Sequence, residues 1–173
     1  ERFSVSGFWD QVRRYGATQI HYLGGVFSLL MKHPERPDAA ANPARIAWGA
    51  AAPPDMWPAF ERRFGVRVHE CYGLTEGSSF TTMNLAGKVG SIGKPVDHFE
   101  VRIVDSDNRP LPANQRGEIV QRELVPGMLM AGYPNDPEGT KAALRDGWLH
   151  TGDLGYYDAD GFYYFVGRKK DSI

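Results

Sequence analysis

The sequence has 173 residues, enough for one large domain or two small ones. Its 20 Lys and Arg nearly balance 21 Asp and Glu, and a formal charge of −1 gives no indication of a nucleic acid or an anionic membrane as partner. A 42% hydrophobic content is sufficient for a core, and the single cysteine, Cys71, excludes an internal disulfide and a cysteine-rich zinc site. No apolar run approaches the about 18 residues of a transmembrane segment and no signal peptide is recognised, which predicts a globular cytoplasmic protein.

The first half of the chain alternates helical and strand patterns. Apolar residues at helical spacing predict a first helix that Ser4 or Ser6 caps and Gly16 ends. A short apolar helix follows the first strand, and a third helix has Pro54 in its first turn and ends at Gly65. Strands are predicted for residues 18–23, 45–48 and 66–72. Strands and helices in this alternation predict a parallel sheet with right-handed crossovers.

The second half changes character near Gly87, where glycines and prolines begin to separate short β-like runs. One short helix is predicted from Pro137 to about Leu144. The strand-like runs cover residues 99–104, 117–121, 155–157 and 162–166. The fold class is therefore α/β, with a parallel βαβ portion over residues 1–87 and a small antiparallel sheet or barrel over 88–166.

Two predicted strands run directly into turns of small residues. The segments Gly49–Ala52 and Gly73–Ser79 are rich in backbone donors or hydroxyl groups. Ligands of open parallel sheets bind beyond the carboxyl ends of the strands. We therefore expect these two turns to hold any small molecule bound by this half of the chain.

The second of these turns belongs to the densest cluster of polar groups. Glu70 and Tyr72 share one face of a strand, where the ring could stack on an adenine and the carboxylate could accept from its amine. Thr75 offers a hydroxyl to a phosphate, and Glu76 offers the hard oxygen that Mg²⁺ prefers. A structural interpretation is also open, in which Thr75 and Glu76 cap a helix and Tyr72 belongs to the core.

Two later motifs also carry polar groups suited to a nucleotide. Thr151–Asp153 reads as a tight glycine turn whose carboxylate could accept two hydrogen bonds from a ribose, or as an ordinary Asx-turn. In the segment Gly167–Asp171, Arg168 could reach a ribose or phosphate, although a solvated charged linker explains this segment equally well.

Taken in order, these three motifs resemble the central signatures of the adenylate-forming superfamily, which includes acyl-CoA synthetases, luciferases and peptide-synthetase adenylation domains. Further similar stretches are GSIGKP at 90–95, NRPLPANQRGE at 108–118 and GWLH at 147–150. The run GWLHTGDLGYYDADGFYYFVGR is most similar to acyl-CoA ligases of the crotonobetaine/carnitine type. The resemblance covers nearly the whole chain.

The resemblance implies a role for each matched position. It makes Thr75 and Glu76 the catalytic residues, because Thr75 would bind the α-phosphate and Glu76 would hold the magnesium ion. It makes Lys170 the hinge to a C-terminal domain, within a hinge segment at 167–173. The nucleotide-binding residues that it implies are Gly49, Ala50, Ala51, Glu70, Tyr72, Gly73, Thr75, Asp153 and Arg168.

The implied reaction is that of an AMP-forming acid–thiol ligase. A carboxylic acid would attack ATP to give an acyl-adenylate, and coenzyme A would then displace AMP to give a thioester. Neither the family's Pro-Lys-Gly phosphate loop nor its C-terminal catalytic lysine is found in this sequence. We therefore expect an internal fragment of the large N-terminal domain, inactive alone and able to self-associate through exposed apolar surface.

Two other functions share the same motifs. The chain could belong to a peptide-synthetase adenylation domain or a luciferase-like oxidase, which use the same scaffold for another second step. It could also be a non-catalytic nucleotide-binding module, an interpretation that the presence of Thr75, Glu76, Asp153 and Arg168 disfavours.

Overall fold

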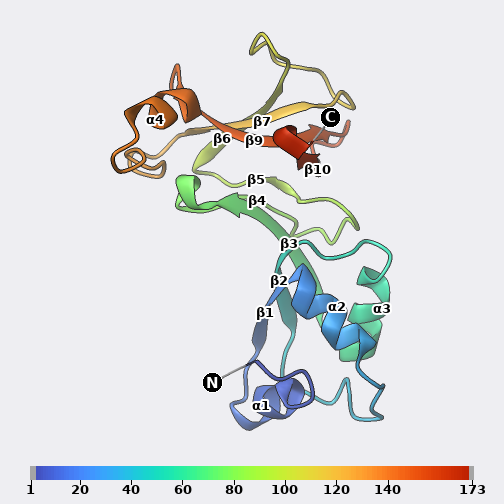
Figure 1. Ribbon diagram of the computed structural model, residues 1–173. Helices are drawn as coiled ribbons and strands as arrows, with labels where there is room; N and C mark the ends of the chain where they lie inside the picture. The colour runs from blue at the N-terminus through green and yellow to red at the C-terminus, as the bar shows by residue number, and fades with distance from the viewer. Residues whose placement is uncertain (1–2, 172–173) are drawn as a thin grey trace. The chain divides into compact units, whose positions relative to one another are not determined.

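The chain folds into two compact units in the computed structural model, which describes residues 3–171 (Figure 1). The first unit comprises the chain up to Glu70 together with Asn84–Gly90, and the second comprises Cys71–Met83 together with the chain from Ser91 onward. The units therefore interleave along the sequence. Domain boundaries at residues 87 and 166 stay a prediction, as does a hinge at 167–173, of which residues 172–173 lie outside the described residues.

Helices alternate with parallel strands in the first unit. Its elements are α1 (Phe8–Arg14), β1 (Gln19–Leu23), α2 (Gly24–Lys32), β2 (Ile46–Ala50), α3 (Trp57–Phe64) and the start of β3 (Arg67–Leu74). Strand β1 pairs in parallel with β2, and β2 pairs in parallel with the first residues of β3. This pairing confirms the predicted parallel topology. Parallel strands need a long crossover connection, and here each crossover contains a helix.

Aromatic rings make up much of the first unit's core. Helices α2 and α3 lie side by side (Figure 1). The rings of Phe27 in α2 and Phe60 in α3 stack with their centroids 3.9 Å apart. Trp9 of α1 stacks on Phe64 with a centroid separation of 4.6 Å. Burying one such side chain is worth roughly 1.5–3 kcal/mol, so this cluster fixes the three helices together.

Two predicted helix starts differ from the structure. Helix α1 begins after Gly7 with no capping side chain, and Ser4 Oγ instead accepts from Gly7 N at 3.3 Å. Helix α3 has Pro58, not Pro54, in its first turn, because Pro54 belongs to a preceding turn. The predicted end of α3 is confirmed, since Gly65 adopts the left-handed conformation with φ 67°.

Antiparallel pairing dominates the second unit. The end of β3 pairs with β4, which pairs with β5, and a separate sheet has the strand order β10-β9-β7-β6 with β8 alongside β9. Their bounds are β4 Ser79–Met83, β5 Lys94–Pro95, β6 Phe99–Val104, β7 Gly117–Glu123, α4 Pro137–Ala143, β8 Leu144–Arg145, β9 Trp148–Tyr157 and β10 Tyr163–Arg168. The predicted antiparallel portion and its helix near 137 are confirmed.

Strand β9 is much longer than the predicted run at 155–157. Residues Thr151–Asp153, predicted as a tight turn, lie inside it at a break in the register with β7, where Gly152 has φ 71°. A glycine at positive φ is typical of a β-bulge as well as of a turn. The prediction of a turn was wrong because the flanking residues remain paired with neighbouring strands.

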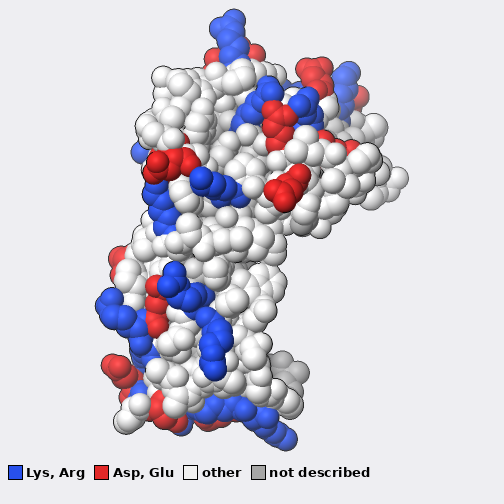
Figure 2. All heavy atoms as spheres, turned by 180° about the vertical axis from the view of Figure 1, so that it is seen from behind, with Lys and Arg blue, Asp and Glu red and all other residues white. Residues whose placement is uncertain are grey.

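The surface carries both signs of charge. Figure 2 shows Lys and Arg side chains interspersed with Asp and Glu side chains over each unit, as the near-zero net charge predicts. Among the helices of residues 3–171, none is both long and apolar enough to cross a membrane.

Candidate functional site

A buried carboxylate holds the turn that follows β2. Glu70 is 6% exposed and lies in β3 beside Gly49 of β2. Its Oε1 accepts from Ala51 N at 2.5 Å, while its Oε2 accepts from Ala52 N at 3.1 Å and from the Tyr22 hydroxyl at 2.5 Å. These bonds fix the backbone at Ala51, which has φ 63°.

The acid–base behaviour of Glu70 follows from this setting. Burial raises the pKa of the Glu70 carboxyl, and the bonds from Tyr22, Ala52 and Ala51 offset only part of that effect. Both carboxylate oxygens already accept hydrogen bonds from the protein. The structure therefore gives Glu70 a role in shaping Gly49–Ala52, and its contact with an adenine amine stays a prediction.

The Tyr22→Phe variant tests this arrangement, because it removes the hydroxyl donor to Glu70 and keeps the ring. We expect the free energy of unfolding at pH 7 to fall by about 1.5–3 kcal/mol, the usual value of a hydrogen bond to a charged group. The hydrogen bond from Tyr22 lowers the pKa of Glu70, which burial has already raised, so removing the Tyr22 hydroxyl raises the pKa of Glu70 further. The loss of stability caused by the substitution should therefore grow as pH rises through the pKa of folded Glu70. It should shrink below the ordinary value of 4.5, where Glu70 is protonated in the folded and the unfolded protein.

Urea unfolding of the two proteins at several pH values measures this effect. Tyr15→Phe is the matched control, because Tyr15 lies exposed in the same unit. An equal loss of stability at all pH values in Tyr22→Phe would contradict the assignment.

A second group of residues meets within the second unit. The Tyr72 hydroxyl donates to Asp153 Oδ2 at 2.7 Å, and Arg168 Nε lies 3.1 Å from Asp153 Oδ1. Asp153 is 4% exposed and is the cross-strand neighbour of Arg168 in the β9–β10 ladder. Burial raises the pKa of the Tyr72 hydroxyl, and the Asp153 carboxylate adds to this effect, so Tyr72 remains a donor. Side chains from β3, β9 and β10 thus form one group that is joined by a hydrogen bond and an ion pair.

The placement of these residues decides one of the open alternatives. Arg168 is the last residue of β10 and pairs with a buried carboxylate, so it does not belong to a solvated linker. Tyr72 is 9% exposed and packs with the core of the second unit, as the structural interpretation of this residue expected. Stacking of its ring on an adenine stays a prediction.

The bulge that carries Asp153 is fixed by its own network. Thr151 Oγ1 donates to Ile119 O at 2.7 Å and accepts from Asp153 N at 3.1 Å. Gly152 N donates to Glu118 Oε1 at 3.1 Å. The sequence did not identify Glu118 as a residue that contacts this bulge. The Gly-Glu pair at 117–118 is nevertheless the end of one of the stretches that resemble the adenylate-forming superfamily.

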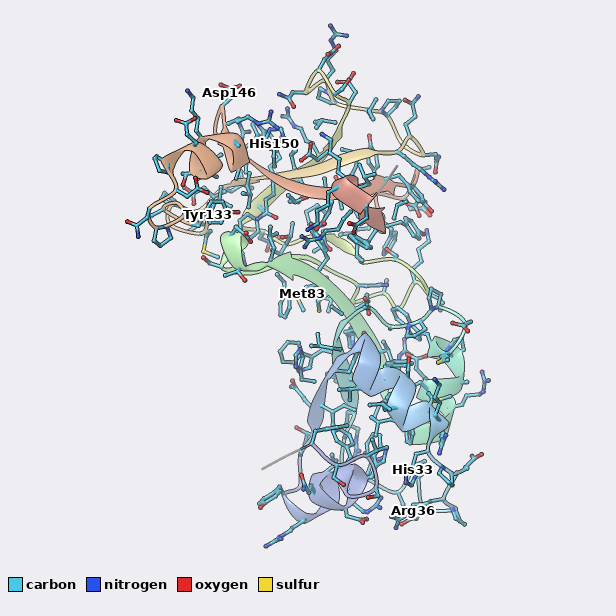
Figure 3. The ribbon with its side chains drawn as sticks, viewed as in Figure 1. His33, Arg36, Met83, Tyr133, Asp146 and His150 are labelled. Atoms are coloured by element: carbon cyan, nitrogen blue, oxygen red, sulfur yellow. The ribbon has the colours of Figure 1, made fainter. Side chains whose placement is uncertain are left out.

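Thr75 and Glu76 lie in a short 3-10 helix, Thr75–Gly77, directly after β3. Neither residue caps it, because Leu74 is at the cap position and no side chain bonds there. Glu76 Oε1 accepts from the Tyr133 hydroxyl at 2.8 Å, and Glu76 O accepts from Met130 N at 2.7 Å. Tyr133, labelled in Figure 3, is a second contact that could not be read from the sequence. The Glu76 carboxylate is thus held at one oxygen.

Gly49 and Ala50, predicted as part of a turn, are instead the last two residues of β2, and Gly49 is buried. Two further predicted positions are accessible. Gly73 is exposed in β3, and Lys170 is exposed in a 3-10 helix, Lys169–Asp171, after β10. Within the part of the chain that the structure describes, no group of three or more His, Cys, Asp or Glu side chains is arranged to hold a metal ion.

Comparison with known proteins gives consistent matches. Residues 1–133 match the family model described as AMP-binding enzyme. The chain is 40% identical to sulfoacetate–CoA ligase of Cupriavidus necator over 99% of its length, and 37% identical to crotonobetaine/carnitine–CoA ligase of Salmonella paratyphi C over 100%. It covers 34% of each of these two ligases, and so spans about a third of their length.

A solved structure gives the same result for the fold. The o-succinylbenzoate coenzyme A synthetase of Bacillus subtilis, solved with ATP and magnesium, superposes with a TM-score of 0.82 at 30% identity. The superposition covers 99% of this chain and 36% of that synthetase.

Proposed function

Because the chain belongs to the AMP-binding enzyme family, we propose that it is part of an ATP-dependent acyl-CoA synthetase, an AMP-forming acid–thiol ligase. The whole protein would join a carboxylic acid to ATP, release pyrophosphate, and pass the acyl group from the adenylate to coenzyme A. The observation that carries this proposal is the group of Tyr72, Asp153 and Arg168, in which a hydrogen bond and an ion pair join side chains from β3, β9 and β10.

We assign the ribose to Asp153 within this proposal. A carboxylate offers about four acceptor sites, so the contacts from Tyr72 and Arg168 leave capacity for two hydroxyl groups. The Arg168 side chain is 55% exposed, which allows it to reach a ribose or a phosphate as well. Thr75 is exposed, and we assign its hydroxyl to the α-phosphate.

Glu76 is the proposed magnesium ligand. Magnesium is commonly held by one or two carboxylates together with substrate phosphates, so a single protein carboxylate fits this ion. Tyr133 donates to Oε1, and we assign Oε2 to the metal. When bound, the ion would neutralise charge that develops on the phosphate oxygens.

The chain's own residues would bind and orient the reactants. Asp153 and Arg168 would hold the nucleotide, and Thr75 would donate to the α-phosphate as its charge increases. For the first unit we propose the role that the resemblance gives it, in which the backbone of Gly49–Ala51 contacts an adenine. Lys170 is proposed as the hinge residue.

An exchange experiment tests the reaction. The full-length protein, incubated with ATP, Mg²⁺, labelled pyrophosphate and a panel of carboxylic acids, should incorporate label into ATP only when a suitable acid is present. Reactions without acid and without Mg²⁺ are the controls. Absence of exchange with every acid would refute the proposed function.

We also propose a cytoplasmic location and self-association of the isolated chain. Cys71, the single cysteine of the sequence, cannot form an internal disulfide, which is consistent with a reducing compartment. Exposed apolar side chains at Leu85, Leu124 and Val125 support association between copies.

A further inference from the structure

We propose that Glu118 is a positioning residue for the nucleotide site, because its carboxylate holds both the bulge that carries Asp153 and the end of β10 that carries Arg168. The inference rests on the proposed function, since Asp153 and Arg168 are the residues assigned to the nucleotide. Glu118 itself would touch neither substrate nor metal.

The first contact fixes the bulge. Glu118 lies in β7 opposite Leu154 of β9, immediately beside the break in register. Its Oε1 accepts from Gly152 N at 3.1 Å, so the residue before Asp153 is tied to the neighbouring strand by a side chain instead of a ladder bond. Asp153 N is held in turn by Thr151 Oγ1. The backbone on both sides of the Asp153 nitrogen is therefore fixed.

The second contact fixes the end of β10. Lys169 Nζ lies 3.0 Å from Glu118 Oε2, and Lys169 follows Arg168 directly in the chain. The Lys169 side chain is 57% exposed, so this ion pair is worth little by itself. Its effect is to anchor the residue next to Arg168 and to restrict where the guanidinium can lie relative to Asp153.

The charge state of Glu118 suits this double role. Burial acts to raise the pKa of the Glu118 carboxyl, but the bonds from Lys169 and Gly152 outweigh burial and hold the pKa below its ordinary value. His150 Nδ1 lies 3.6 Å from Glu118 Oε2. Burial, and to a smaller extent the charge of Arg145, lowers the pKa of His150, which favours the neutral form of His150. Lys169 is thus the cation that Glu118 pairs with near pH 7.

Four variants of the full-length protein separate the contacts. Glu118→Ala removes both, and Glu118→Gln keeps an oxygen for Gly152 N but loses the charge that pairs with Lys169. Lys169→Met removes the ion pair alone. Glu100→Gln is the matched control, because Glu100 pairs with Arg102 and Arg122 on the same sheet and does not contact the bulge.

Calorimetric titration with AMP, together with Tm measurements, gives the decisive readout. We expect Glu118→Ala to weaken AMP binding about tenfold, Glu118→Gln and Lys169→Met about threefold or less, and Glu100→Gln not at all. In kinetics, Glu118→Ala should raise KM for ATP while KM for the carboxylic acid stays unchanged. A merely structural role would lower Tm without this selective effect on the nucleotide.

The possible outcomes are distinguishable. If Glu118→Ala binds AMP as tightly as the unmodified protein while Asp153→Ala does not, the inference is overturned and the proposed function survives. If the unmodified protein binds no AMP, the proposed function fails as well. Should Glu118→Ala not fold, Glu118→Asp keeps the charge but shortens the side chain, and the same loss of AMP affinity is expected.

Discussion

Replacing Asp153 by alanine in the full-length protein is expected to weaken ATP and AMP binding by about 100-fold or more. The variant loses two proposed hydrogen bonds from the ribose to a charged acceptor, each worth about 1.5–3 kcal/mol. It also leaves the buried hydroxyl of Tyr72 and the guanidinium of Arg168 without the carboxylate that they share. Equilibrium binding of AMP, followed by calorimetry, measures the loss.

A matched control separates binding from stability. Asp105 Oδ1 accepts from Asp107 N and Arg109 N in a hairpin of the same unit, so Asp105→Ala also removes a carboxylate that organises the backbone. We expect this variant to lower Tm and leave AMP affinity unchanged. If Asp153→Ala bound AMP as well as Asp105→Ala does, Asp153 would not hold the ribose.

Replacing Gly49 by alanine is expected to lower the free energy of unfolding by about 3 kcal/mol or more. A Cβ at this position would lie 1.9 Å from the carbonyl oxygen of Tyr22 in the neighbouring strand. A backbone atom cannot move aside as a flexible side chain can, so β1 and β2 would have to separate. Overpacking usually costs about 1–3 kcal/mol even where side chains adjust, so a larger loss is expected here. Urea unfolding, followed by the tryptophan fluorescence of the first unit, measures the change.

Gly25→Ala is the control for Gly49→Ala. Gly25 lies in α2, where an alanine Cβ would have no atom within 4 Å, so this substitution should stabilise the protein by about 0.5–1 kcal/mol through the better helix propensity of alanine. Similar unfolding midpoints for the two variants would show that the close approach at Gly49 does not limit the fold.

The family and the fold class could be predicted from the sequence, and both are confirmed. Periodic patterns are local and were read correctly where the pattern continued through an element, as in β6 and α4. The turn predicted at Thr151–Asp153 was wrong because a glycine at positive φ has the same local signature in a turn and in a bulge. Only pairing with β7, which depends on distant residues, distinguishes them.

The candidate site divides in the same way. Asp153 and Arg168 could be singled out because they belong to short motifs that occur in order. Tyr22, Glu118 and Tyr133 could not, because each acts through a partner 48, 34 and 57 residues away, respectively. Single-residue patterns carry no information on such contacts, so the residues that support a site are harder to predict than the residues that belong to its motifs.

The interleaving of the two units limits how such a protein can be divided. The chain leaves the first unit after Glu70, returns at Asn84 and leaves again after Gly90. A protease cut or a recombination breakpoint at any single position would therefore leave part of one unit attached to the other unit. Exchange of either unit between related chains would require three breakpoints, after Glu70, after Met83 and after Gly90.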